Sequence, residues 1–207
     1  ALLGAIPRAA LAADLPAGDC KRPAARTDLS ACDWSRAKLA GKDLRGARFA
    51  GARMENADFR KARLDEADFR GSNVKWGNFS KASLKAADFR NADLFHAIFD
   101  EADVSDGRFG GANLFGANLI NTRAVRTDFA GAQLKDILME GIDLSGGSMR
   151  GCYAFRGVFS GARLVGTDLS GADLTGAAAE NADFSGAKLG GTKLLGATLR
   201  FAVFKDA

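Results

Sequence analysis

Histidine, tyrosine, proline and cysteine are scarce in this sequence of 207 residues, which holds one, one, three and three of them. With His96 as the only histidine, the residues form no nucleophile–histidine–acid set. No Cys-x-x-Cys pair occurs and His96 lies far from the cysteines, so the ligands of a zinc site are missing. We therefore expect no catalytic residue, no metal and no cofactor.

Long apolar runs and an excess of one charge are also missing. No stretch reaches the roughly 18–20 apolar residues of a membrane-spanning helix. The net charge of +4 comes from 29 basic and 25 acidic residues that are interspersed along the chain. This balance is typical of a solvated surface and gives no electrostatic reason to expect nucleic-acid binding.

The first residues, "ALLGAIPRAALAAD", are apolar and differ in composition from the rest. Two interpretations stay open. One is an export signal with cleavage before Asp14, although no basic region precedes the apolar stretch. The other is a short capping helix that starts at Pro7. Export would place the protein in the periplasm or another exported location and would allow a Cys20–Cys32 disulfide; the alternative is the cytoplasm.

A repeat of five residues fills the rest of the chain. Every fifth residue from Leu29 to Phe204 is apolar, and the register never slips. The residue two places earlier is small everywhere except at Lys42, Ile137 and Ile142. A period of five matches neither a helix face nor a strand, so the chain must turn a corner every five residues. Four such sides close a square coil, and we expect an all-β solenoid of about nine coils of 20 residues.

The units "ADFRK", "ADLFH", "ANLFG" and "ADLTG" resemble the pentapeptide-repeat family. The resemblance covers residues 27–206 and implies a right-handed quadrilateral β-helix. We accordingly divide the chain into an N-terminal segment, residues 1–26, and a β-helix, residues 27–207. Functions of repeat solenoids reside on their outer surfaces, so the family fold leaves the function open.

Stacking the outward positions at intervals of twenty gathers the unusual apolar residues along one edge. On other outward columns these positions are mostly Asp, Arg, Ser or Gly. A contiguous apolar patch that is rich in aromatic residues is typical of a protein interface. The alternatives are cover by the N-terminal segment and chance scatter. The residues of this aromatic edge are Trp76, Phe95, His96, Ile98, Phe115, Ile120, Leu138, Tyr153, Phe155 and Val158.

The last residues, "FAVFKDA", follow directly on the final coil. Uncovered backbone at the end of a solenoid can pair with another chain. We therefore expect that Phe201, Val203 and Phe204 can support an end-to-end homodimer.

Two functional hypotheses follow. The first is a non-catalytic structural or protein-interaction module, a rigid scaffold that presents the aromatic edge to a protein partner. The alternative comes from the resemblance, because quinolone-resistance pentapeptide proteins mimic DNA and bind DNA gyrase through an acidic surface. The positive net charge argues against this alternative. Direct nucleic-acid binding is disfavoured, because the basic residues of the early coils lie on different sides. These are Arg45, Arg48, Arg53, Arg60, Lys61 and Arg63.

Overall fold

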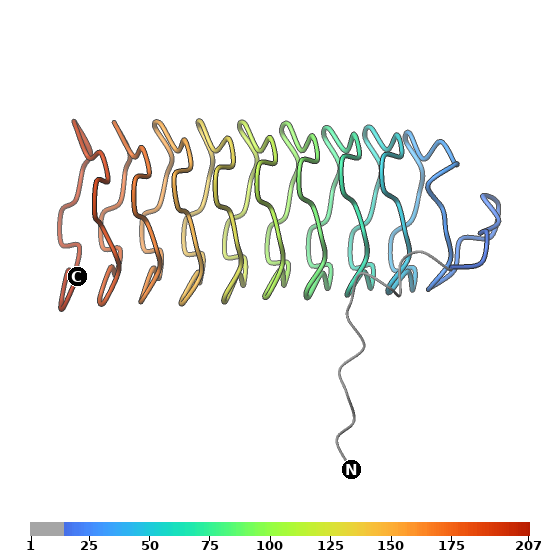
Figure 1. Cartoon of the computed structure of the whole chain (residues 1–207), viewed down its shortest axis with the longest axis horizontal. Helices are drawn as coiled ribbons and strands as arrows, with labels where there is room; N and C mark the ends of the chain where they lie inside the picture. Colours follow the sequence, from blue (N-terminus) through green and yellow to red (C-terminus); the bar gives the residue numbers. More distant parts are fainter. Residues whose placement is uncertain (1–14) are drawn as a thin grey trace, which may run out of the picture.

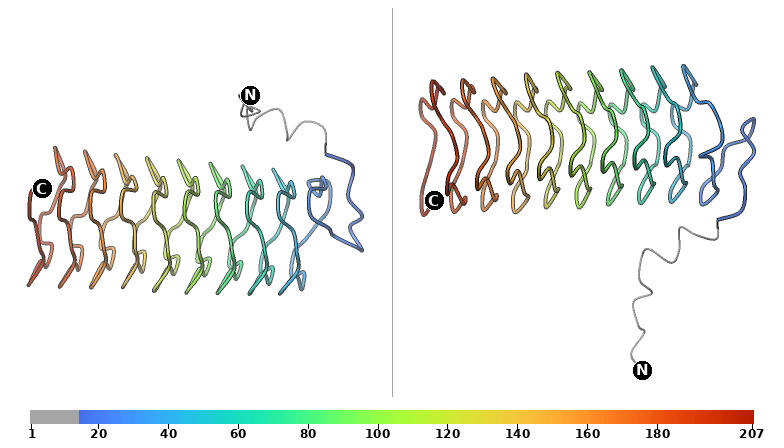
Figure 2. Two further views of the ribbon diagram at one scale, coloured as in Figure 1. Left: turned by 90° about the horizontal axis from the view of Figure 1, so that it is seen from below. Right: turned by 45° about the horizontal axis from the view of Figure 1, so that its top comes forward.

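The structure is a computed structural model that describes residues 15–207. In this part of the chain there is no helix and no strand longer than one bridged residue. Parallel β-bridges instead join residues twenty apart, from the pair Asp28 and Arg48 to the pair Asp183 and Val203. The chain thus forms a rod of stacked four-sided coils (Figures 1 and 2). Each side contributes a single bridge, because it has only five residues before the next corner.

Each corner is a tight turn that the five-residue unit builds for itself. After the inward residue Leu94, the backbone of His96 takes a left-handed conformation with φ of 53°. The N–H of Ala97 then donates to the carbonyl of Leu94 at 2.9 Å and closes the turn. Asp and Asn side chains just before the inward residue accept the N–H two places later, as Asp168 does from Ser170 at 3.0 Å. The repeat therefore encodes its own corners.

Backbone hydrogen bonds hold successive coils together. The N–H of Leu94 donates to the carbonyl of Asn113 at 2.7 Å, and the N–H of Asn113 donates to the carbonyl of Ala92 at 3.0 Å. The same pattern repeats on all four sides along the rod. Residues twenty apart consequently lie in straight columns, which Figures 1 and 2 show as successive coils of nearly the same outline.

Two of the four inward columns of the core are rich in phenylalanine and lie on opposite sides of the coil, and the other two hold mainly leucine. Within a column the rings stack face to face, as Phe69 and Phe89 do at 4.5 Å and Phe59 and Phe79 do at 4.9 Å between centroids. Across the interior the rings meet edge to face, as Phe79 and Phe89 do at 5.7 Å. These are the two arrangements that the aromatic quadrupole favours. Each of the two columns thus forms an aromatic ladder.

Residues 15–26 lie at the N-terminal end of the rod and contain no helix. Ala17 forms a parallel bridge with Asp28, and the N–H of Gly18 donates to the carbonyl of Asp28 at 2.8 Å. A disulfide joins Cys20 to Cys32, with 5.7 Å between their Cα atoms. The predicted cleavage before Asp14 and most of the predicted capping helix lie outside the described residues. Residues 15–26, which the structure does describe, pair with the first coil.

Candidate interaction surface

The outward surface on one side of the rod has three parts, which we name by their position in the coil. The second corner follows the inward residues 74, 94, 114 and so on, and includes residues 75–76, 95–96, 115–116, 135–136, 155–156, 175–176 and 195–196. The third face is the next outward column. The bridges order this column as Asn78, Ile98, Asn118, Leu138, Val158, Ala178 and Thr198. The third corner follows it and includes residues 80–81, 100–101, 120–121, 140–141, 160–161, 180–181 and 200–201.

Four residues of the aromatic edge form one continuous cluster on the second corner. Trp76 meets Phe95 edge to face at 5.6 Å, and Phe95 stacks on Phe115 at 5.3 Å with an interplanar angle of 7°. The His96 ring lies 4.3 Å from Phe95 and 5.9 Å from Phe115. Lys135 extends the cluster, with its Nζ 5.5 Å from the centre of the Phe115 ring.

Tyr153 and Phe155 form a second, smaller cluster. Their rings are nearly parallel at 6.1 Å, and the Arg156 guanidinium lies 5.5 Å from the Phe155 ring. Arg156 also binds Asp136 through two hydrogen bonds of 2.7 and 2.8 Å, and this ion pair lies between the two clusters. Tyr153 belongs to the second face, where it bridges Gln133 and Asp173, while the rest of the edge lies farther round the coil.

Ile98, Leu138 and Val158 occupy the third face and Ile120 the third corner. The N–H of Ile120 donates to Asp100 at 3.2 Å. Burial raises the pKa of the Asp100 carboxyl, and the hydrogen bond from Ile120 opposes this effect only in part. The structure thus distributes the predicted edge over the second face, the second corner, the third face and the third corner.

Exposure along the aromatic edge is uneven. Trp76 is 47% exposed and His96 is also exposed, but the other large residues of the edge are half-buried. The reason is the stacking itself, because each ring covers one face of the ring twenty residues away. Leu195, which is 80% exposed, lies on the same corner and was missed. Its position in the repeat, which it shares with Phe95, Phe115 and Phe155, is the signal that would have found it.

Trp76 and His96 occupy the left-handed position of the turn, with φ values of 54° and 53°. A residue with a Cβ costs roughly 1–2 kcal/mol in this conformation, and glycine occupies the position in many other coils. His96 rests on the backbone of the next coil, with Nδ1 3.1 Å from the carbonyl oxygen of Gly116. Two large rings therefore stand where the backbone favours glycine.

The C-terminal residues are strongly exposed. Phe201 is 77%, Val203 48% and Phe204 38% exposed. Phe204 stacks on Phe184 at 4.9 Å and so continues a column of inward residues, whereas Phe201 lies on the third corner with Arg200 5.7 Å from its ring. The three residues predicted to act together thus belong to different parts of the last coil.

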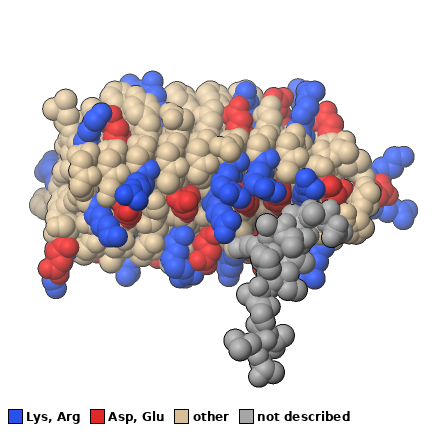
Figure 3. Space-filling view, viewed as in Figure 1, with Lys and Arg blue, Asp and Glu red and all other residues tan. Residues whose placement is uncertain are grey.

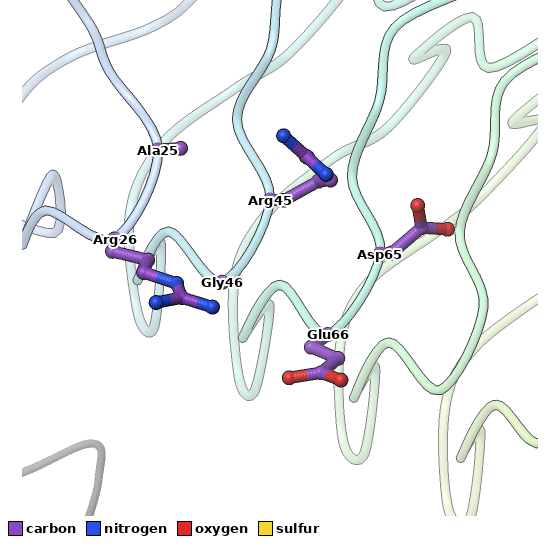
Figure 4. Close-up of a pocket in the computed structure, with 6 residues that line it drawn as sticks. All are labelled: Ala25, Arg26, Arg45, Gly46, Asp65 and Glu66. Carbon is purple, nitrogen blue, oxygen red and sulfur yellow. The ribbon is translucent and has the colours of Figure 1, made fainter.

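Nothing in residues 15–207 assembles a reactive centre. No group of three or more metal-ligating side chains occurs there. The thiol of Cys152 is buried, and burial raises its pKa to about 12, so it stays protonated at neutral pH. A hollow of about 280 Å³ lies at the fourth corner, which includes residues 25–26, 45–46 and 65–66. It is lined by Ala25, Arg26, Arg45, Gly46, Asp65 and Glu66 (Figure 4). Its basic and acidic residues come from successive coils, and none of them is a nucleophile beside a base.

Many charged residues form ion pairs with one another. Arg60, Arg70 and Arg90 each bind the aspartate two positions earlier through paired hydrogen bonds, such as those of 2.8 and 2.7 Å from Arg70 to Asp68. Blue and red atoms lie beside one another along the visible side of the rod in Figure 3. In residues 15–207 no helix has the length and apolar character needed to span a membrane.

Comparison with known proteins gives matches to two family models. "Pentapeptide repeat region" matches residues 42–119, and "Pentapeptide repeats (8 copies)" matches residues 108–151, 158–191 and 182–207. No curated protein matches the sequence. Neither model describes a family of enzymes.

Solved structures with a similar backbone include HetL, a pentapeptide repeat protein involved in heterocyst differentiation regulation from the cyanobacterium Nostoc sp. It is 29% identical over 82% of this chain and 86% of HetL, with a TM-score of 0.47. A pentapeptide repeat protein from the Arabidopsis thaliana thylakoid lumen is 34% identical over 48% of this chain and 69% of its own, with a TM-score of 0.47.

QnrB1, a plasmid-mediated fluoroquinolone resistance protein, is 24% identical over 76% of this chain and 89% of its own, with a TM-score of 0.29. All these TM-scores are below 0.5, so the family assignment rests on the family models and on the unbroken five-residue period. The chain is a member of the pentapeptide-repeat family and has that family's right-handed quadrilateral β-helix.

Proposed function

We propose that this protein is a non-catalytic interaction module whose rigid prism, the nine coils counted in the sequence, presents the aromatic edge to a protein partner. The observation that carries the proposal is the cluster of Trp76, Phe95, His96 and Phe115 on the second corner. Aromatic side chains that are partly exposed and rigidly held are typical of the central residues of interfaces. Such rings lose little side-chain entropy on binding, because their neighbours already fix them.

The side chains rather than the backbone set Trp76 and His96 apart. Their left-handed conformation is shared by Arg36, Asp136 and Arg156 on the same corner. Only Trp76 and His96 place an aromatic ring there, and both rings contact Phe95.

The alternative is a DNA mimic that binds DNA gyrase, which would be expected of a surface dominated by acidic residues. The net charge of +4 and the local Asp–Arg pairs do not favour it. Strong inhibition of gyrase supercoiling by the purified protein would favour this alternative over the aromatic edge. Direct binding to nucleic acid is not proposed, because the basic residues are divided among the sides and several of them, such as Arg45 and Arg60, are paired with aspartates.

We further propose that the protein works in the periplasm or another exported location. Disulfides persist in oxidising compartments and are rare in the cytoplasm of most organisms, and Cys20 and Cys32 are joined here. Mass spectrometry of the protein from its native cells tests both points. A mature chain that begins near Asp14 and holds this disulfide would support export, and a reduced, uncleaved chain would support a cytoplasmic location.

The end-to-end homodimer through Phe201, Val203 and Phe204 stays a proposal. Their exposure supports it, because 77% of Phe201 and 48% of Val203 are open to solvent. Val203→Asp would then weaken self-association in analytical ultracentrifugation, while Arg150→Asp, on a remote corner, would leave it unchanged. Unchanged association of the Val203 variant would contradict this proposal.

Affinity isolation from native cells tests the aromatic edge. We expect the proteins bound by the tagged wild type to be lost with Phe95→Asp and Phe115→Asp and retained with Arg150→Asp. Trp76→Ala provides a milder variant, since Trp76 is 47% exposed and its removal disturbs the coil less. Circular dichroism checks that each variant is folded. If the same proteins bound all variants equally, the aromatic edge would have no part in binding.

A further inference from the structure

The third face differs from the other three faces because a long run of its outward residues is uncharged. From Asn78 to Thr198 the column holds no Asp, Glu, Lys or Arg. The second face, with Asn113, Gln133 and Tyr153 in succession, has a shorter uncharged run. The first face, the column from Asp28 to Lys188, and the fourth face, the column from Asp43 to Val203, hold mostly charged residues of both signs. The uncharged column spans six coil spacings of about 4.8 Å, or about 29 Å in all.

The two corners that border this face carry complementary residues at the same level of the rod. Lys135 on the second corner lies level with Glu140 on the third, and neither makes an ion pair within residues 15–207. Phe115 lies level with Ile120. Leu195 lies level with Phe201, and these two are the most exposed large hydrophobic residues described, at 80% and 77%.

The uncharged column and the complementary corners both suit a two-fold axis that is parallel to the rod and lies along the middle of the third face. Rotation about such an axis places the second corner of one copy against the third corner of the other, at the same coil. Each residue of the third face then meets its own copy, so a charged residue there would face a like charge. An uncharged column between two complementary corners is what this symmetry requires.

We propose that the third face is a homodimer interface in which two copies pack with parallel axes and with their coils in register. The proposal rests on the proposed function, because it names the partner for the same surface as a second copy of this chain. Lys135 then faces Glu140 of the second copy, Phe115 faces Ile120, and Leu195 faces Phe201. The interface extends from Ile98 toward Thr198. At the level of Asn78, Lys75 would face Lys81 of the second copy, and at earlier levels Asp58 and Lys38 would meet their own copies.

The antiparallel alternative lacks this complementarity. It would place each second corner against a second corner and each third corner against a third corner. Between residues 100 and 181 the third corner holds Asp100, Glu101, Glu140 and Glu180 and no basic residue. Like charges would then face one another along that corner, which costs free energy when they are brought together. The parallel arrangement instead sets the acidic corner against Lys135 and His96.

Charge reversal on the full chain tests the proposal by sedimentation equilibrium over a range of concentrations. Wild type should dimerise. Lys135→Glu and Glu140→Lys should each raise the dissociation constant by at least about tenfold, because each variant places like charges at positions 135 and 140 and the two-fold symmetry makes this contact occur twice. An equimolar mixture of the two variants should associate again, because each introduced charge would face the opposite introduced charge, and the unchanged Lys135 would face the unchanged Glu140. Arg150→Glu, on a corner away from the third face, should behave as wild type.

If association returns in the mixture, misfolding is not the reason why each variant alone fails to dimerise, because mixing leaves both sequences unchanged. A second readout fixes the orientation. Ile98→Cys and Val158→Cys should each crosslink to themselves with a short bis-maleimide, because parallel copies in register bring both positions to the axis. An antiparallel pair could crosslink at only one level.

A wild type that stays monomeric at every concentration would overturn the homodimer, and so would reversal variants that dimerise as wild type does. Crosslinking at one level only would overturn the parallel arrangement. None of these results would affect the isolation of another protein through Phe95 and Phe115, so the proposed function and this inference can fail separately.

Discussion

At the scale of single residues, the contact of His96 with Gly116 shows that a side chain of one coil can restrict the residue type at the same position of the next coil. Gly116 has φ of 62°, and a Cβ at this position would lie 2.5 Å from Cε1 of His96. Gly131 has a similar φ of 66°, but nothing lies within 4 Å of where its Cβ would be. The two glycines share the same backbone requirement and differ in what lies next to them.

Alanine at the two glycines should therefore have different costs. Gly131→Ala should lower the free energy of unfolding by about 1–2 kcal/mol, which is the cost of a Cβ in the left-handed region. Gly116→Ala should lower it by a further ~1–3 kcal/mol, because the His96 ring must move. Urea denaturation measures both. In a His96→Ala background the difference should vanish, and its persistence would contradict the assigned contact.

At the scale of the coil, aromatic stacking makes neighbouring coils depend on one another. Phe89 stacks on Phe69 at 4.5 Å and on Phe109 at 4.8 Å, and it meets Phe79 and Phe99 edge to face. Its side chain is fully buried. Each repeat of a solenoid contacts only its neighbours, so a defect in one coil weakens two junctions.

Phe89→Ala should lower the free energy of unfolding by about 3–5 kcal/mol, because it leaves a cavity between two rings. Phe89→Leu conserves much of the volume and should cost less than about 1.5 kcal/mol. Thermal and urea denaturation give the comparison. Equal losses for both variants would show that the ring volume is not what stabilises this level of the rod.

The disulfide joins the N-terminal segment to the first coil. Cys20 and Cys32 are separated by 12 residues, and Cys32 is an inward residue of that coil. Closing a loop of about this length restricts the unfolded chain and stabilises the fold by about 3 kcal/mol in the chain-entropy description. Residues 15–28 are thereby held against the N-terminal end of the rod.

Reduction should therefore lower the free energy of unfolding by about 2–4 kcal/mol, and Cys20→Ser with Cys32→Ser should have the same effect. Amide exchange should increase first in the coil that contains Leu29 and Trp34. The double variant should not respond to reductant, because the remaining Cys152 is buried and unpaired. A response of that variant would show that the reductant acts elsewhere.

At the scale of the whole molecule, the environment lowers the pKa of several aspartates along the rod. Hydrogen bonds from Arg45 lower the pKa of Asp43 to about 2. Hydrogen bonds from Ser170 and Ser185 lower the pKa values of Asp168 and Asp183, and burial, which raises the pKa of Asp88, is outweighed by the hydrogen bonds from Arg90. Asp100 is the opposite case, because burial raises its pKa.

These directions predict loss of stability in acid. A carboxyl whose pKa is lower in the folded state contributes stability above its unfolded pKa and loses it as the pH falls through the folded value. The unfolding temperature should thus fall between about pH 4 and pH 2. Asp43→Asn should reduce this dependence, whereas Asp100→Asn should increase it, since the raised pKa of Asp100 partly opposes the others. Calorimetry across this range gives the result, and a rise in unfolding temperature toward pH 2 would contradict it.

The repeat alone was enough to predict the core, the corners and the columns. Because the period of five never slips, four units per coil place residues twenty apart directly above one another. Phe69, Phe89 and Ala92 could be assigned as inward residues from their place in the unit, and all three are buried. The grouping of Trp76, Phe95 and Phe115 followed from the same periodicity, and these rings are in contact in sequence order.

What the sequence alone determined is therefore which side of the coil each residue lies on, since backbone geometry repeats at every corner. The tertiary structure decided how much of each side chain stays open. Phe95 and Phe115 are half-buried because they stack on each other, while Leu195 has no such neighbour and is 80% exposed. It also decided which charges are paired: Arg156 reaches Asp136 twenty residues away, whereas Arg70 turns back to Asp68. Side-chain direction at a corner depends on the neighbouring coil, and no five-residue pattern contains that information.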